Sequence, residues 1–156
     1  GVKDQVDHVR YQLKHDRASR RILTNMYNFA DLSEMNLYPC AYSMTFNVSG
    51  NVLNAILNQR SQDMLVANNW NVVQDAVLVI FRAGLVPGEL VHVIADAHIY
   101  DRHIPIVEEI IQREQHPAPE VKLGEEAKDF MSVTPDTLQL VNYQHSGLVR
   151  GIPVAV

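Results

Sequence analysis

The one cysteine of the chain, Cys40, stands directly behind Pro39 and directly before a run of alternating side chains. Such a thiol is either a small buried hydrophobe or, where nearby positive charge stabilises the thiolate, a nucleophile. Its position favours a nucleophile, because the proline fixes the backbone in a turn and the end of a strand exposes the side chain. The arginines that could supply the charge form two groups, Arg60 and the adjacent pair Arg20 and Arg21.

The arginine groups also suit an anionic ligand. Arg60 is followed by Ser61, and a guanidinium fork with a hydroxyl matches the oxygens of a phosphate group. Arg20 and Arg21 stand at the start of an expected strand, where neighbouring side chains point to opposite faces. Both can serve one site only at a loop-to-strand junction, and the alternative is an ordinary surface pair.

Three more polar residues could contact a small ligand. Asn71 follows Trp70 at the start of an expected helix, where an N-terminal cap is the other interpretation. His98 and Tyr100 are two apart on an expected strand and so share one face. On that face they could bond a sugar hydroxyl or form a half-buried structural pair. The histidines are scattered, without HxxxH or HExxH spacing or a second cysteine, so we expect no metal.

Strands and helices must position these residues. Residues 41–48 alternate cleanly, which predicts a strand that turns at 48–52 and returns along 52–61. We also predict a strand over 20–28, a buried helix over 72–80 with Gly84 as its cap, and a strand over 88–100. Further predicted elements are a helix from Val6 to near Asp16, a helix over 101–114 and an extended segment over 116–123. The expected fold class is α+β, with a mixed or antiparallel sheet covered by helices.

The composition predicts one ordinary domain over residues 1–156, because the chain is 47% apolar and long enough to bury a core. No apolar run approaches the roughly 18 residues of a membrane span, so we expect no membrane association. One cysteine cannot form an internal disulfide, which favours the reducing cytoplasm. A net charge of -5 argues against binding to DNA, although local arginines can hold a small anion.

In their order along the chain, the motifs resemble one family, thymidylate synthase. They are SRRI (Ser19–Ile22), YN (Tyr27–Asn28), LYPC (Leu37–Cys40), QRSQD (Gln59–Asp63), Asn71, PGE (Pro87–Glu89), DAHIY (Asp96–Tyr100) and the closing VAV. The resemblance runs from about Asp4 to Val156 and covers only the C-terminal part of a complete family member. It implies the α+β fold of that family and a homodimer.

The resemblance implies a reductive methylation of dUMP to dTMP. Cys40 would add to carbon 6 of the uracil, and 5,10-methylenetetrahydrofolate would supply both the carbon and the hydride. Arg60 would bind the phosphate and keep the cysteine anionic. Arg20 and Arg21 would bind the same phosphate from the other subunit, which removes the objection from strand geometry.

The other matching positions would hold the rest of the nucleotide. The resemblance implies that Ser61 joins the phosphate and that Gln59 lies beside the nucleotide. His98 and Tyr100 would bond the 3′-hydroxyl of the sugar. Asn71 would pair with the uracil edge, since its amide can donate to the 4-carbonyl and accept from the ring N–H.

The folate side shows both matches and departures. Asp63 would lie near the substrate and the pterin, and the carboxylate of Val156 would close over the ternary complex. The sequence NNWN precedes Val72 where the family has a different segment, and Ala41 replaces the usual histidine. The family's N-terminal arginine loop and folate-pocket tryptophans have no counterpart here. The alternatives are a uridylate hydroxymethylase of the same superfamily and a non-catalytic nucleotide-binding or dimerisation fragment.

Overall fold

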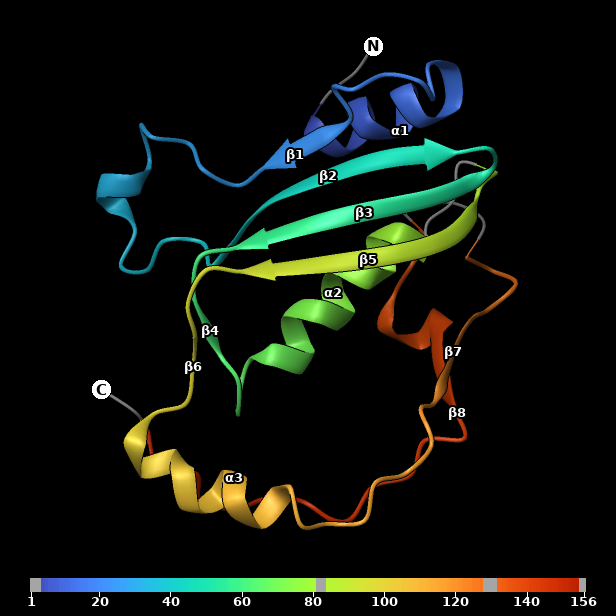
Figure 1. The fold of residues 1–156 in the computed structure, drawn as a ribbon. Coiled ribbons are helices and arrows are strands. Elements are labelled where there is room, and N and C mark those ends of the chain that lie inside the picture. Colours follow the sequence, from blue (N-terminus) through green and yellow to red (C-terminus); the bar gives the residue numbers. More distant parts are fainter. Residues whose placement is uncertain (1–3, 81–83, 128–131, 155–156) are drawn as a thin grey trace. The chain divides into compact units, whose positions relative to one another are not determined.

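The structure, a computed structural model, describes residues 4–80, 84–127 and 132–154. It divides the chain into two units, Gly1–Ile99 and Tyr100–Val156 (Figure 1). From the sequence we expect one domain over residues 1–156. Whether the two units form such a domain stays a prediction.

A four-stranded mixed sheet forms the base of the first unit. Its strands, in spatial order, are β1 (Leu23–Asn25), β2 (Ala41–Ser49), β3 (Val52–Gln59) and β5 (Val86–Ile94). The first two pairings are antiparallel, whereas β3 and β5 run parallel. The hairpin between β2 and β3 turns at Gly50, whose φ of 62° lies in the left-handed region that glycine enters without strain. The predicted hairpin is therefore confirmed, while the strand predicted over 20–28 is shorter.

The core of the first unit lies on one face of this sheet. Met44 and Phe46 of β2 are 2% and 5% exposed, as the alternation predicts. They pack with residues of β3 and of α1 (Gln5–His15), whose Val9 and Leu13 are buried in the same cluster. Burying a side chain of this size stabilises the fold by about 1.5–3 kcal/mol. The helix predicted from Val6 is confirmed, and Asp4 caps it by accepting from the Asp7 amide at 2.9 Å.

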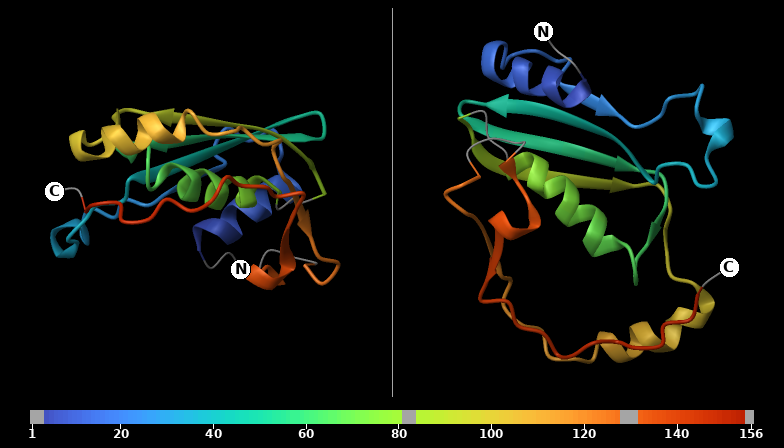
Figure 2. Two further views of the ribbon diagram at one scale, coloured as in Figure 1. Left: turned by 90° about the horizontal axis from the view of Figure 1, so that it is seen from below. Right: turned by 180° about the vertical axis from the view of Figure 1, so that it is seen from behind.

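The opposite face of the sheet carries apolar side chains that this unit leaves exposed. The strand register places Leu23, Thr45, Ile56 and Val91 in one row across the four strands. Leu23, Ile56 and Val91 are 45%, 38% and 49% exposed. Both helices of the unit, α1 and α2 (Asn68–Ile80), lie on the other side of the sheet (Figure 2). The row is therefore uncovered within the unit.

The α2 helix rules out one alternative interpretation and corrects one expectation. It begins at Asn68, and the Asn71 amide donates to the Ala67 carbonyl at 3.2 Å, so Asn71 is inside the first turn and is not the cap. The helix was also expected to be buried along Val72, Val73, Ala76, Val77 and Ile80, but Val73 is 58% exposed. Apolar spacing defines a face and does not say what covers it. Gly84 has a left-handed φ of 72°, but residues 81–83 of the predicted cap lie outside the described chain.

Two short strands complete the first unit. β4 (Gln62–Asp63) pairs in parallel with β6 (Ala97–His98), with Asp63 opposite His98. The strand predicted over 88–100 is thus divided into β5 and β6. The chain leaves β3 after Ile94, and the Asp96 carbonyl accepts from the Gln62 amide at 2.8 Å. A 3-10 turn, η1 (Leu32–Glu34), interrupts the loop before Cys40.

The second unit contains short elements. They are η2 (Asp101–His103), α3 (Ile104–Ile110), β7 (Glu120–Leu123), η4 (Pro135–Thr137) and β8 (Leu138–Val141). β7 and β8 form an antiparallel pair with Glu120 opposite Val141. The predicted helix over 101–114 is confirmed in its position but ends at Ile110. Among the described residues, no helix has the length and apolar character needed to cross a membrane. Strands and helices together confirm the α+β class.

Candidate active site

Sheet pairing brings the cysteine turn next to the end of β3. Ala41 pairs with Gln59 across the hairpin, and the Arg60 amide donates to the Cys40 carbonyl at 2.9 Å. Residues twenty positions apart in the sequence are therefore held side by side by the antiparallel ladder. Cys40 is a free thiol and half-buried, so it is partly reachable from outside.

The Arg60 side chain wraps around the turn that carries the thiol. Its Nη2 donates to the Tyr38 carbonyl at 2.7 Å, and its Nε donates to the Pro39 carbonyl at 3.1 Å. The same Nη2 lies 3.7 Å from the Cys40 sulfur. The positive charge of the guanidinium therefore lies close to the sulfur. Its Nη1 makes no hydrogen bond to any residue that the structure describes.

The residues after Arg60 are held in a fixed turn. Ser61 is half-buried and its carbonyl accepts from the Gln59 side chain at 2.8 Å. Asp63 accepts from the amides of Leu65 and Val66 at 2.9 and 3.2 Å, which orders the turn leading into α2. The α2 helix then presents Asn71, half-buried, from its first turn. One short stretch of the chain therefore carries three of the predicted ligands, Ser61, Asp63 and Asn71.

Gln59, predicted to lie beside a nucleotide, is almost fully buried at 2% exposed. Its side chain bonds the neighbouring Gln62 and the ring of His92 on β5. Burial lowers the pKa of His92 below its ordinary value, so the ring is neutral at pH 7. Sequence reasoning missed His92, because nothing local connects it with Gln59, 33 positions earlier.

His98 and Tyr100 were expected to share a strand face, and this is wrong. β6 ends at His98, and Tyr100 belongs to the second unit. Nδ1 of His98 lies 3.7 Å from the Asp96 carboxylate, and the His98 carbonyl accepts from the Met64 amide at 3.0 Å. The Tyr100 ring packs edge-on against the ring of His103, with centroids 5.5 Å apart. The two residues are therefore positioned by different parts of the fold.

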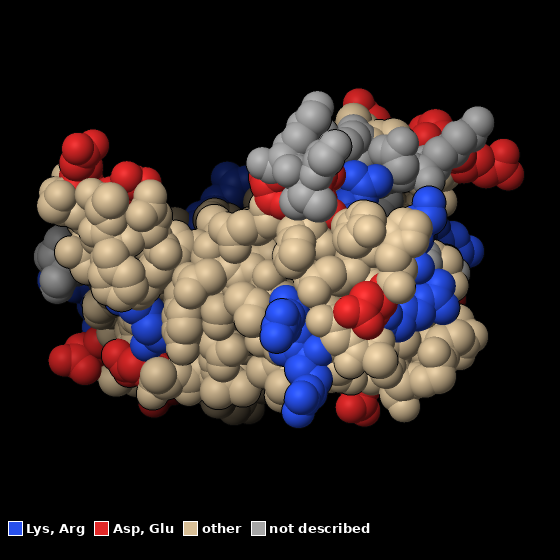
Figure 3. Space-filling view, turned by 90° about the horizontal axis from the view of Figure 1, so that it is seen from above, with Lys and Arg blue, Asp and Glu red and all other residues tan. Residues whose placement is uncertain are grey.

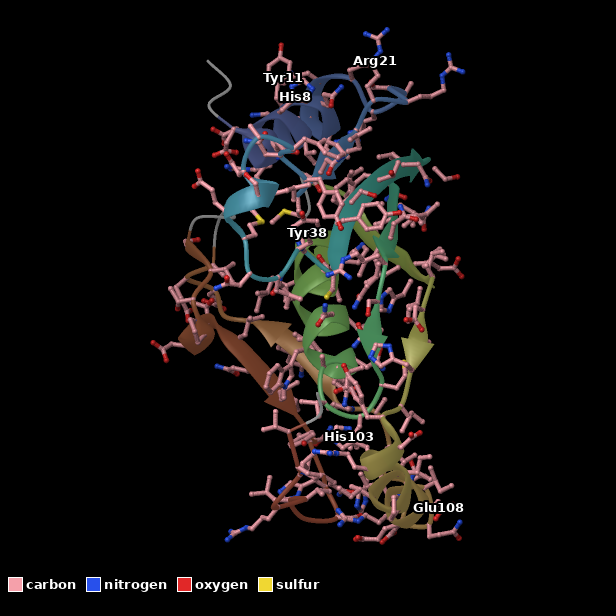
Figure 4. The ribbon with its side chains drawn as sticks, turned by 90° about the vertical axis from the view of Figure 1, so that its left-hand side faces the viewer. His8, Tyr11, Arg21, Tyr38, His103 and Glu108 are labelled. Carbon is pink, nitrogen blue, oxygen red and sulfur yellow. The ribbon has the colours of Figure 1, made fainter. Side chains whose placement is uncertain are left out.

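Arg20 and Arg21 lie in the loop between α1 and β1, so the alternation of a strand does not apply to them. Both are exposed, and neither guanidinium bonds or pairs with another residue that the structure describes. Figure 3 shows Lys and Arg side chains on the face that carries α1, and Figure 4 shows Arg21 pointing outwards from it.

The sheet register separates this pair from Cys40. The Phe46 amide donates to the Ile22 carbonyl at 2.8 Å, so Arg21 lies beside a point at least six positions along β2 from Cys40. At about 3.3 Å per residue, six positions span about 20 Å. This distance is well beyond the reach of an arginine side chain. The pair and the thiol therefore do not converge within one chain.

The second unit holds the chain just before its predicted C-terminal ligand. His103, 2% exposed, donates from Nε2 to the Pro153 carbonyl at 2.8 Å. Arg102 donates to the Val154 carbonyl at 3.0 Å. Sequence reasoning missed both residues, although they follow directly after the DAHIY motif. Val156 itself lies outside the described residues.

The described residues include no group of three or more His, Cys, Asp or Glu side chains that could hold a metal ion. The predicted site residues of the first unit offer a thiol, guanidiniums, a hydroxyl, a carboxylate, an imidazole and amides. The fold and the site define a class first: an α+β protein whose one cysteine stands beside a cationic side chain that can hold an anion.

The chain belongs to the thymidylate synthase family, because the family model described as thymidylate synthase matches residues 1–156. It is 40% identical over 145 residues to a thymidylate synthase of Bacillus subtilis subsp. natto, covering 91% of this chain and 52% of that protein. It is 39% identical over 155 residues to thymidylate synthase 1 of Bacillus amyloliquefaciens, covering 97% of this chain and 67% of that protein.

The solved structure of thermostable thymidylate synthase A from Bacillus subtilis is similar to the chain with a TM-score of 0.90 and 37% identity. The match covers 96% of this chain and 55% of that one. This confirms the family resemblance and the fold class expected from the sequence. The chain spans about half the length of most of the curated relatives it matches.

Proposed function

We propose that this chain carries the catalytic cysteine of a thymidylate synthase, which converts dUMP to dTMP with 5,10-methylenetetrahydrofolate. The observation that supports this most is the Arg60 side chain, which bonds the Tyr38 and Pro39 carbonyls and lies 3.7 Å from the Cys40 sulfur. The pathway served would be nucleotide biosynthesis. The reducing cytoplasm suits an enzyme that works through a free thiolate.

The proposed chemistry begins at Cys40. Its thiolate forms a bond to carbon 6 of the uracil, and the electron pair of the 5,6 double bond moves to carbon 5 as an enolate. Carbon 5 then attacks the methylene carbon of the folate, and one carbon–nitrogen bond of that methylene group breaks. Carbon 5 loses its proton, the second carbon–nitrogen bond breaks, and the released tetrahydrofolate gives a hydride to the methylene group, which completes the methyl group. The bond between the sulfur and carbon 6 breaks in the same step, so Cys40 leaves as a thiolate and the folate as dihydrofolate. The role of Arg60 is to stabilise the anionic sulfur before the attack.

The nucleotide would be held on both sides of the thiol. Ser61 and Nη1 of Arg60 would bind the phosphate, and Asn71 would read the uracil edge. His98 and Tyr100 would bond the 3′-hydroxyl of the sugar. Gln59 is buried, so its part would be to support the ligands next to it without touching the nucleotide.

Asp63 and Val156 would serve the folate side. Asp63 already orders the turn before α2, which places a fixed carboxylate near Asn71 in the chain. The hydrogen bonds from Arg102 and His103 to the chain at 153–154 would fix the segment from which the Val156 carboxylate closes over the bound ligands.

We propose a homodimer with sites shared between two copies. The row formed by Leu23, Ile56 and Val91 gives each copy an apolar sheet face that its own helices leave open. The distance of about 20 Å along β2 supports a role for Arg20 and Arg21 in the site of the other copy. Two guanidiniums without a partner among the described residues of their own chain would then bind the phosphate of the neighbouring site.

The test is release of tritium from 5-tritiated dUMP by the full-length protein in the presence of the folate. Release that depends on Cys40, together with a product of the mass of dTMP, is expected. A product heavier than dTMP by one oxygen would identify the hydroxymethylase alternative. No release, and no covalent adduct of Cys40 with fluorodeoxyuridylate, would leave the non-catalytic alternative.

A further inference from the structure

A buried chain of side-chain hydrogen bonds lies behind the segment that carries Arg60. Gln59 at the end of β3 and Gln62 on β4 are 2% and 1% exposed. The Gln59 amide nitrogen donates to the Ser61 carbonyl at 2.8 Å and to the Gln62 side-chain oxygen. On its other side, the Gln59 oxygen lies 2.9 Å from Nε2 of His92 on β5.

The acceptors in this series of hydrogen bonds determine which atom of each side chain donates. The Ser61 carbonyl can only accept, so the NH₂ group of Gln59 must face it and the Gln59 oxygen must face His92. Nε2 of His92 therefore carries the proton and donates. The amide nitrogen of Gln62 in turn donates to the Asp63 carbonyl at 3.1 Å. The donors thus run in one direction, from the β5 ring to both ends of the Ser61–Asp63 turn.

The last acceptors in this series of hydrogen bonds are the carbonyls of residues that have a role in the proposed function. Ser61 and Asp63 are proposed ligands, and Arg60 precedes them with its guanidinium beside Cys40. If the His92 donor is removed, the Gln59 oxygen is left buried without a partner. Gln59 can then rotate its amide, and its bond to the Ser61 carbonyl is lost as well.

We propose that His92 is a positioning residue that acts through Gln59 to fix the Arg60–Asp63 segment against Cys40 and a bound phosphate. The proposal rests on the proposed function for the identity of that phosphate, which is the phosphate of dUMP. Its effect on Cys40 does not depend on that identity. His92 touches neither the thiol nor the ligand, and its part is to hold one amide in one orientation.

Three variants of the full-length protein test this. His92→Phe keeps a ring and removes the donor. His92→Gln places an amide N–H close to the position of Nε2, whereas His92→Asn is one methylene shorter and does not reach Gln59. His8→Phe, an exposed histidine of α1, is the matched control for the loss of an imidazole.

Two measurements follow each variant. The first is dUMP affinity by calorimetry, and the second is the alkylation rate of Cys40 by iodoacetamide, followed by mass spectrometry of the peptide that contains Cys40. We expect His92→Phe and His92→Asn to weaken dUMP binding by about tenfold and to change the alkylation rate severalfold, as the loss of a buried hydrogen bond would. His92→Gln and His8→Phe should stay within about twofold of wild type on both.

The outcomes separate the proposal from the proposed function. If wild type does not bind dUMP, the proposed function fails, and the alkylation rates still test the positioning. If His92→Phe does not fold, the pair His92→Gln and His92→Asn carries the comparison. Equal dUMP affinity and equal alkylation rates in those two variants would overturn the proposal.

Discussion

Arg60 and the pair Arg20–Arg21 have the same proposed ligand but very different surroundings. The Arg60 guanidinium is fixed by two backbone carbonyls and lies beside the Cys40 sulfur. Arg20 and Arg21 are exposed in a loop, with no partner among the residues that the structure describes. Under the proposed function, the difference would mean that each chain positions its own nucleophile with Arg60, whereas Arg20 and Arg21 bind the phosphate in the site of another copy.

The largest effect should come from Cys40→Ser. Because the hydroxyl is a far weaker nucleophile than a thiolate, we expect tritium release to fall at least about 1000-fold, or about 4 kcal/mol in the barrier. Binding of dUMP should stay close to wild type, because the clamp is intact. Calorimetry and the tritium assay on one preparation check both. Loss of dUMP binding together with activity would mean that the thiol shapes the phosphate site.

Arg60→Ala should weaken dUMP binding and also lower the reactivity of Cys40. It removes the charge beside Cys40 and two hydrogen bonds to the turn, so dUMP binding should weaken by about 1.5–3 kcal/mol per lost charged bond. Cys40 should also react more slowly with iodoacetamide. Arg60→Lys, which keeps the charge and loses the fork, should give an intermediate result. Wild-type alkylation in Arg60→Ala would show that Arg60 does not organise the thiol.

Ile56→Lys tests the uncovered sheet face. An ammonium in the middle of an apolar interface should weaken the dimer by at least about 2 kcal/mol, because its charge loses water without gaining a partner. Sedimentation equilibrium measures the change, and circular dichroism checks that the fold is kept. Val121→Lys on β7, also an exposed valine of a strand, is the control. An unchanged dimer would place the interface elsewhere.

The smallest effect concerns Asp75 on α2, a buried carboxylate whose Oδ2 has no partner among the described residues. Burial raises its pKa above the ordinary 3.8, so the folded state binds this proton more tightly than the unfolded state. The contribution of Asp75 to stability therefore falls as the pH rises from 3.8 through the raised value.

Asp75→Asn should accordingly raise the free energy of unfolding at pH 7–8 by on the order of 1 kcal/mol, and the gain should shrink towards pH 4. Urea unfolding at several pH values measures it, with the exposed Glu108→Gln as the control. A loss of stability in Asp75→Asn at pH 7 would mean that the carboxylate has a partner in the full protein.

The sequence predicts best where the signal is local. The alternation after Cys40 and the glycine of the next turn predict the hairpin, and the hairpin register alone brings Arg60 to the thiol. His92 could not be found in this way. His92 lies beside Gln59 because β5 pairs in parallel with β3, and α2 separates these two strands in the sequence. No motif near either residue indicates that the two strands pair.

The other errors have similar causes. The periodicity of Val72 to Ile80 defines an apolar face of α2 but not whether anything covers it, and Val73 is exposed. The run from 88 to 100 has strand composition throughout, yet it leaves β3 after Ile94 to pair with β4. Whether Arg20 and Arg21 serve a neighbouring copy depends on contacts between chains, which a single sequence pattern does not contain.

The most direct test of the shared site is to mix two variants, Cys40→Ser and the double variant Arg20→Ala/Arg21→Ala, at a dUMP concentration below the dissociation constant of the double variant. After subunit exchange, half of the dimers pair the two variants, and each such dimer has one intact thiol opposite one intact arginine pair. About a quarter of the wild-type sites would then be whole, so we expect tritium release to rise from near zero to about that fraction. No recovery in verified heterodimers would contradict a site shared between two copies.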